Sequence, residues 1–167
     1  MALNSYTTVA QTKVIINEFS NGDSSDHDWI ELIVTVDGTD LRGLYLTTRA
    51  TYGGYPQTGS ATVDLTKGIE LSKSNGDLNG LNKGTIIVIY KAGSKSSSLP
   101  ADHFTIADGY ICIPSNDPTF MESGGTWASL TGYDGINNAS NAILLYSSNN
   151  NVLTGIFCVQ YGSSSYS

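Results

Sequence analysis

Charged residues are scarce in this chain, and the basic ones are both few and scattered. Lysine and arginine number 8 against 15 acidic residues, which gives a formal net charge of −7 at neutral pH. Nucleic acids and anionic membranes attract proteins through clustered basic side chains, whereas here these residues lie between Lys13 and Lys95 without forming a cluster. We therefore expect neither a nucleic-acid partner nor attachment to an anionic membrane.

Long apolar runs and sustained helical periodicity are also lacking. No run approaches the length of a membrane-spanning helix, so we expect no membrane insertion. The first residues carry no basic segment followed by an apolar one, and we interpret Met1-Ala2-Leu3 as a start that replaces a signal peptide. Acidic surfaces rich in Tyr, Ser and Asn are common on exported proteins, which favours an extracellular, periplasmic or cell-surface location.

Cysteine and histidine are too few for the common metal and catalytic patterns. Cys112 and Cys158 both lie in apolar, strand-like runs, where they are either free thiols packed as small hydrophobic residues or one disulfide between adjacent strands. His27 and His103 are single and well separated, and no Ser or Cys has the surroundings of a nucleophile. The sequence thus predicts neither a catalytic triad nor a zinc site.

Strand signals fill the chain instead. A length of 167 residues suits one domain, and 18 glycines with a hydrophobic fraction of 40% favour a folded all-β protein over a disordered one. Residues 14–19 and 28–34 are rich in β-branched and aromatic residues, and a loop of turn-forming residues separates them. These two runs predict an antiparallel pair.

Further strand-like runs follow, with turn signals between them. Thr85 to Tyr90 is a continuous apolar run, which predicts a central strand covered on both faces. The segment 115–141 is long and polar, and Asp117 is placed to cap a helical turn with Pro118 in its first position. Other expected strands are 41–47, a short edge strand at 61–65, 69–72 and one within 107–113. A terminal hairpin is expected from 142–146 and 152–159.

Taken in order, these pieces resemble the lamin tail domain family in its bacterial form, across about residues 13 to 162. The resemblance is carried by an "INE" strand at 16–18, a "WIEL" strand at 29–32 and an "L-x-G-x-x-L" strand at 41–46, together with the apolar run at 81–89, residues 135–145 and the final hairpin. Two departures are the missing "YN" after the second strand and the long segment before Gly135.

The resemblance implies an immunoglobulin-like antiparallel β-sandwich with a long insertion before the last hairpin. It divides the chain into an N-terminal extension (1–12), the sandwich domain (13–162) and a flexible C-terminal tail (163–167). It also implies a structural or interaction module of an exported or cell-surface bacterial protein, without catalytic residues, that binds a protein or a surface component. We expect it to be a monomer or a weak homo-oligomer.

Two carboxylates in the opening strands form the one candidate for catalysis. Glu18 and Glu31 face each other if their strands pair, as the paired carboxylates of glycosidases do. Strand carboxylates more often accept hydrogen bonds or pair with basic residues, and we expect these two, with Trp29 packed in the core, to stabilise the fold. A glycosidase-like hydrolase is therefore the least favoured alternative.

A metal site is conceivable in the loop between the two opening strands. Asp23, Asp26 and Asp28 place hard oxygen ligands of the kind that Ca²⁺ prefers within a few residues, although their spacing is not that of an EF-hand. Asp residues also occur in such loops because their side chains stabilise turns. Calcium is therefore the only cofactor we consider, as part of an alternative function in Ca²⁺-dependent or carbohydrate-binding adhesion.

Aromatic residues outside the strands are the candidate binding residues. Tyr52, Tyr55, Trp127 and Tyr133 would form a platform for a sugar or a protein if they are exposed together. The alternative is that these rings cover the ends of the sandwich beneath long loops.

Overall fold

The computed structural model describes residues 12–20, 27–47, 69–122, 140–149 and 152–162. These residues form strands and two short 3-10 helices, η1 (Gly76–Leu78) and η2 (Ile106–Asp108), and no α-helix occurs among them. The described part of the chain is therefore all-β, as the sequence predicts.

The first sheet has the strand order β1-β2-β5-β6. It consists of β1 (Val14–Ser20), β2 (Trp29–Val34), β5 (Ile86–Tyr90) and β6 (Tyr110–Pro114). The first two strands form the expected antiparallel pair, and β5 lies between β2 and β6 with four of its five residues buried. The predicted central strand covered on both faces is thereby confirmed.

The pair β5–β6 is parallel, which corrects the expectation of a purely antiparallel arrangement. Parallel neighbours need a crossover connection of about a dozen residues or more, and residues 91–109 supply one. This connection also contains η2, and the strand expected within 107–113 begins after it, at Tyr110.

The second sheet has the order β4-β3-β7-β8, and all its pairs are antiparallel. It consists of β3 (Leu44–Thr47), β4 (Ile69–Glu70), β7 (Ser140–Asn149) and β8 (Val152–Gly162). The last two strands are the predicted terminal hairpin. The edge strand expected at 61–65 lies outside the described residues.

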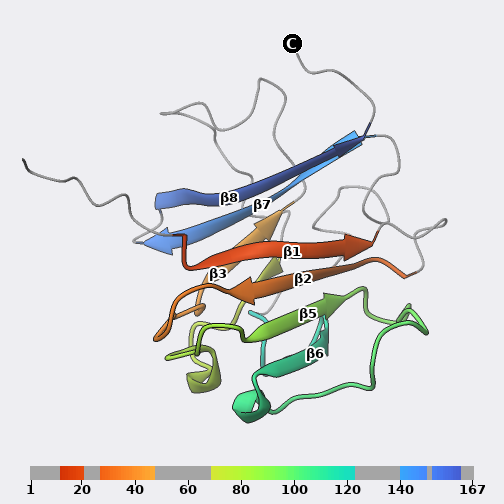
Figure 1. The fold of residues 1–167 in the computed structure, drawn as a ribbon, viewed down its shortest axis with the longest axis horizontal. Helices are drawn as coiled ribbons and strands as arrows, with labels where there is room; N and C mark the ends of the chain where they lie inside the picture. Colours follow the sequence, from red (N-terminus) through yellow and green to blue (C-terminus); the bar gives the residue numbers. More distant parts are fainter. Residues whose placement is uncertain (1–11, 21–26, 48–68, 123–139, 150–151, 163–167) are drawn as a thin grey trace, which may run out of the picture.

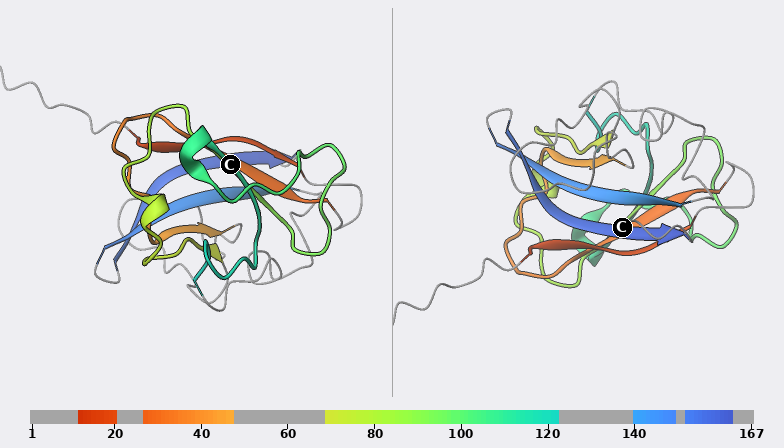
Figure 2. Two further views of the ribbon diagram at one scale, coloured as in Figure 1. Left: turned by 90° about the horizontal axis from the view of Figure 1, so that it is seen from below. Right: turned by 90° about the horizontal axis from the view of Figure 1, so that it is seen from above.

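One hydrophobic core joins the two sheets. In β2 the buried residues alternate with half-buried ones, so that Ile30, Leu32 and Val34 face the second sheet. Residues from β3, β4 and β7 enter the same cluster, among them Leu46, Ile69 and Leu145, each at 0% exposure. Figures 1 and 2 show β3 and β4 behind the first sheet and the β7–β8 hairpin beside β1.

A β-bulge in β1 decides which of its residues enter this core. Ile16 pairs with Leu32 and Glu18 pairs with Glu31, so Asn17 is an extra residue without a partner of its own. The extra residue shifts the in–out alternation by one, which directs Phe19 toward the core and Glu18 away from it.

Two interpretations of single residues are settled by the first sheet. Trp29 is half-buried on the side of β2 opposite the shared core, so its predicted place in the core is wrong; Ile30 holds that place. Cys112 is a fully buried free thiol on β6, which excludes the disulfide alternative and confirms its packing as a small hydrophobic residue.

The predicted cap at Asp117 is confirmed. Its carboxylate accepts hydrogen bonds from the backbone N–H groups of Thr119 and Phe120, and its carbonyl accepts one from Met121. The resulting single turn buries Phe120 and Met121 in the shared core. The rest of the long insertion, residues 123–139, lies outside the described residues.

Candidate interaction face

The surface of the first sheet that points away from the shared core is here called the outer face. It carries the residues of β1, β2, β5 and β6 that alternate with the core residues. Because paired residues of neighbouring strands lie side by side on one face, the register arranges these side chains in rows across the sheet.

One of these rows is apolar from edge to edge. Ile15 pairs with Ile33, Ile33 with Ile86, and Ile86 with Tyr110, and all four side chains are half-buried. We call these four residues the apolar row. A strand that is solvated on its outer side normally places polar residues there, so a continuous apolar row marks a surface suited to contact.

An acidic pair lies in the next row of the outer face. The Asn17 amide donates a hydrogen bond of 2.6 Å to the Glu31 Oε1 atom, and the bulge places the exposed Glu18 directly opposite Glu31. Two carboxylates in direct opposition repel each other, and the Asn17 amide relieves part of this repulsion. A cationic group from a partner would relieve the remainder.

The β5–β6 half of the outer face is covered by the chain itself. Val88, Tyr90 and Cys112 form a second buried cluster, and Leu99 from the crossover packs on it together with Trp29. The β1–β2 half receives no comparable cover from the described residues. The apolar row therefore runs from a covered half of the sheet into a more open one.

Polar contacts fasten the crossover to β5. The Tyr90 hydroxyl donates a 2.9 Å hydrogen bond to Asp102, and the Lys95 ammonium lies 2.5 Å from the same carboxylate and 5.1 Å from the centre of the Tyr90 ring. Hydrogen bonding from Lys95 lowers the pKa of Asp102, while burial and the bond to Asp102 raise the pKa of Tyr90.

Tyr110 is held differently on the neighbouring strand. Its hydroxyl oxygen is buried beside the Cys112 thiol, a weak hydrogen-bond partner, and makes no regular hydrogen bond within the described residues. Burial is the main cause that raises the pKa of both groups. The Tyr110 ring stacks on His103 with centroids 6.1 Å apart, and His103 lies 3.4 Å from the Asp108 carboxylate.

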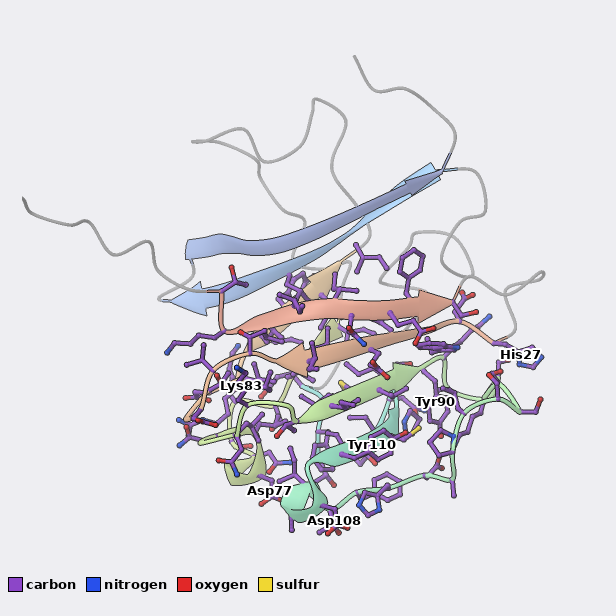
Figure 3. The ribbon with its side chains drawn as sticks, viewed as in Figure 1. His27, Asp77, Lys83, Tyr90, Asp108 and Tyr110 are labelled. Carbon is purple, nitrogen blue, oxygen red and sulfur yellow. The ribbon has the colours of Figure 1, made fainter. Side chains whose placement is uncertain are left out.

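A shallow depression of about 460 Å³ lies at one end of this sheet, between residues 76–85 and residues 106–109. Asp77, Lys83 and Asp108 line it, and Figure 3 shows these residues at the same end of the molecule. Its described lining contains no aromatic ring, cysteine or histidine, and it includes neither Glu18 nor Glu31. No residue of the apolar row or of the acidic pair lines this depression, although its lining residues Thr85 and Gly109 directly precede Ile86 and Tyr110 of the apolar row.

The predicted metal ligands lie largely outside the described residues. This holds for Asp23 and Asp26, whereas Asp28 is buried at 1% exposure where the chain enters β2. The preceding residue, His27, has a φ of 119°, a value that non-glycine residues rarely adopt. The described part of the chain contains no group of three or more His, Cys, Asp or Glu side chains arranged to hold a metal ion.

The predicted aromatic platform lies outside the described residues, since Tyr52, Tyr55, Trp127 and Tyr133 belong to ranges 48–68 and 123–139. The apolar row was missed at the sequence level. Its signal was the run of consecutive apolar residues in both opening strands, because alternation with polar residues would be expected of strands with one solvated face.

In the part of the chain that the structure describes, no helix has the length and apolar character needed to cross a membrane. Comparison with known proteins gives no match to a family model, to a curated protein or to a solved structure.

Proposed function

We propose that this chain is a non-catalytic interaction module of an exported or cell-surface bacterial protein, built as an immunoglobulin-like sandwich of the lamin tail type. Two observations support the fold proposal: the "INE" and "WIEL" strands are neighbours, and two four-stranded sheets share one core. The parallel β5–β6 pair would be a departure from a purely antiparallel sandwich.

The observation that carries the proposed function is the apolar row beside the acidic pair. Apolar side chains in contact with a partner supply most of the binding free energy, and a flanking charge selects among partners. The β1–β2 half of the outer face thus suits a polypeptide segment that presents apolar side chains next to lysine or arginine.

Selection of random dodecapeptides displayed on phage, against the immobilised whole chain, tests this function. We expect enriched peptides that combine apolar residues with lysine or arginine, and weakened binding at high salt. Ile33→Thr shortens the apolar row while keeping a β-branched residue, and it should weaken binding of a synthetic copy of the enriched peptide at least about tenfold, about 1.4 kcal/mol.

Phe104→Ser is the matched control, because it removes an apolar side chain that is 46% exposed and is not one of the four residues of the apolar row. It should leave the affinity of the peptide unchanged. The proposed function is refuted if no peptide is enriched, or if both variants bind the peptide as the wild type does.

Two further measurements on the same protein test the alternative function in Ca²⁺-dependent or carbohydrate-binding adhesion. A rise in melting temperature with CaCl₂ and not with MgCl₂, lost in Asp23→Asn with Asp26→Asn, would indicate a calcium module instead. Binding to a glycan array that Tyr52→Ala with Tyr55→Ala abolishes would indicate a carbohydrate-binding one.

A further inference from the structure

The depression between residues 76–85 and 106–109 has a framework that backbone hydrogen bonds hold in place. The Asn75 side chain accepts a 2.9 Å hydrogen bond from the Asp77 N–H and so caps η1. The Lys83 N–H donates to the Asp37 carboxylate over 2.7 Å, and the Gly109 N–H closes η2 with a 2.8 Å hydrogen bond to the carbonyl at its start. The shape of the depression is thus fixed before any ligand enters.

Most polar side chains that line this depression are not used by the fold. Asp108 contacts His103 at 3.4 Å. The others make no side-chain hydrogen bond and no ion pair with any residue that the structure describes; they are Asp77, Asn79, Asn82, Lys83 and Thr85. Figure 3 shows Asp77 and Lys83 at the same end of the molecule as Asp108. A set of unused donors and acceptors therefore surrounds one preformed space.

Thr85 is the buried member of this set. It lines the depression directly before β5, yet it is only 4% exposed. Its hydroxyl has no hydrogen-bond partner in the described part of the chain, whereas buried hydroxyl groups in proteins are normally hydrogen-bonded. A polar ligand in the depression would supply the missing partner.

The chemistry of the lining indicates the class of ligand. A carboxylate accepts hydrogen bonds, an ammonium group donates them, and amides and hydroxyls do both. Sugar hydroxyl groups can use all of these partners because each donates and accepts, and the apolar residues Leu81 and Ile106 offer contact to C–H groups. The carboxylates of Asp77 and Asp108 outnumber the Lys83 ammonium group, which disfavours an anionic ligand. The volume of about 460 Å³ lies in the range of small-molecule sites.

We propose that this depression binds a neutral monosaccharide or disaccharide. The buried Thr85 hydroxyl exchanges a hydrogen bond with a sugar hydroxyl, and the exposed Asp77 and Lys83 accept from and donate to others. The described lining has no aromatic ring on which a sugar could stack. Binding therefore depends on hydrogen bonds, and we expect it to be weak, in the millimolar range.

A chemical-shift titration of the ¹⁵N-labelled whole chain tests the proposal. The probes are galactose, mannose, N-acetylglucosamine and cellobiose, with glycylglycine as a zwitterion and galacturonate as an anion. We expect at least one neutral sugar to cause saturable shifts in residues 76–85 and 106–109. The proposal is overturned if no sugar does so, or if only glycylglycine or galacturonate binds there.

Thr85→Val removes the buried hydroxyl and keeps the shape of the side chain. It should weaken sugar binding at least about tenfold. Urea denaturation should show unchanged or higher stability, because the hydroxyl has no partner within the described fold to lose. Thr119→Val makes the same change at an exposed residue outside the lining and should leave binding unchanged. Wild-type affinity in Thr85→Val, or a clear loss of its stability, overturns the proposal.

This inference does not rest on the proposed function, although the depression adjoins the apolar row. Ile33→Thr should weaken peptide binding and leave the shifts caused by the sugar intact, whereas Thr85→Val should do the reverse. Tyr52→Ala with Tyr55→Ala should also leave these shifts intact, which distinguishes the depression from the predicted aromatic platform.

Discussion

Two tyrosines on adjacent strands show how much the partner of a buried hydroxyl matters. Tyr90 and Tyr110 both belong to the outer face, and both contact the second cluster. Tyr90 donates its hydroxyl proton to Asp102, whereas the Tyr110 hydroxyl is buried beside a thiol. A satisfied buried hydroxyl stabilises a fold slightly, and a poorly satisfied one destabilises it.

Removing each hydroxyl should therefore change stability in opposite directions. Tyr110→Phe should raise the free energy of unfolding by up to about 1 kcal/mol, because it removes the desolvation penalty of a polar atom. Tyr90→Phe should lower it by about 0.5–1.5 kcal/mol, because the hydrogen bond to Asp102 is lost. Urea denaturation of both variants measures the difference. Equal changes of the same sign would contradict the assignment of partners.

Stability should also fall on the alkaline side. Burial raises the pKa values of Tyr90, Tyr110 and Cys112, so the folded state keeps protons that the unfolded chain releases earlier. The stabilisation is complete below the unfolded values, about 8.5 for Cys and about 10 for Tyr, and is lost as the pH rises through the folded values. Urea unfolding at a series of pH values should show this decline, and Tyr110→Phe should make it shallower. A flat profile up to pH about 11 would contradict the prediction.

At the scale of the element, the bulge in β1 decides that the apolar Phe19, and not the charged Glu18, faces the core. Strict alternation from Val14 and Ile16 would direct Glu18 toward the core and Phe19 toward solvent. The extra residue Asn17 reverses both assignments, and its side chain then binds Glu31 across the strands.

Deletion of Asn17 should consequently be tolerated. Ile16 and Glu18 pair with Leu32 and Glu31, which are adjacent on β2, so the deletion joins two segments that are already in register. Every remaining side chain keeps its face, and the main loss is one solvent-exposed hydrogen bond to a carboxylate, about 0.5–1.5 kcal/mol. Thermal unfolding followed by circular dichroism measures the loss.

Deletion of Ile33 from the regular strand β2 is the control for this experiment. A one-residue slip there moves Val34 and the residues after it to the wrong face, because the side chains of a strand alternate. We expect this variant not to fold. Equal damage from the two deletions would show that Asn17 is not a dispensable extra residue.

The sequence predicted which segments form strands more reliably than which side of each strand faces the core. β-branched runs and turn residues identified β1, β2, β5 and the terminal hairpin, since these signals are local. The face of Trp29 was wrong because alternation alone does not say which of two apolar sets meets the other sheet. The parallel β5–β6 pair was missed for a similar reason, since strand direction depends on the course of the crossover. The apolar row arises from the pairing of residues across four strands. The sequence of any one strand does not contain this pairing.

At the scale of the molecule, the buried residues form two clusters, one shared by both sheets and one confined to the outer face of the first sheet. The shared core receives residues from each of the strands β1 to β7, and so connects both sheets. The second cluster has Val88, Tyr90 and Cys112 as its buried residues and lies under the crossover on one side of the first sheet. The first cluster should therefore determine global stability, and the second should determine only how firmly the crossover is attached.

Substitutions at Leu32 and Leu99 test these two roles separately. Leu32 is fully buried in the shared core, and its replacement by Ala should cost about 2–5 kcal/mol, because a cavity forms between the sheets. Hydrogen exchange should accelerate together in β2 and in β7, although these strands belong to different sheets, because one core unfolds as one unit. Leu99→Ala should cost less and accelerate exchange chiefly in residues 91–105, since this half-buried side chain packs against the second cluster and is not among the described residues of the shared core. If Leu32→Ala left β7 protected while β2 exchanged, the two sheets would be separate cooperative units, and the shared core would not be what couples them.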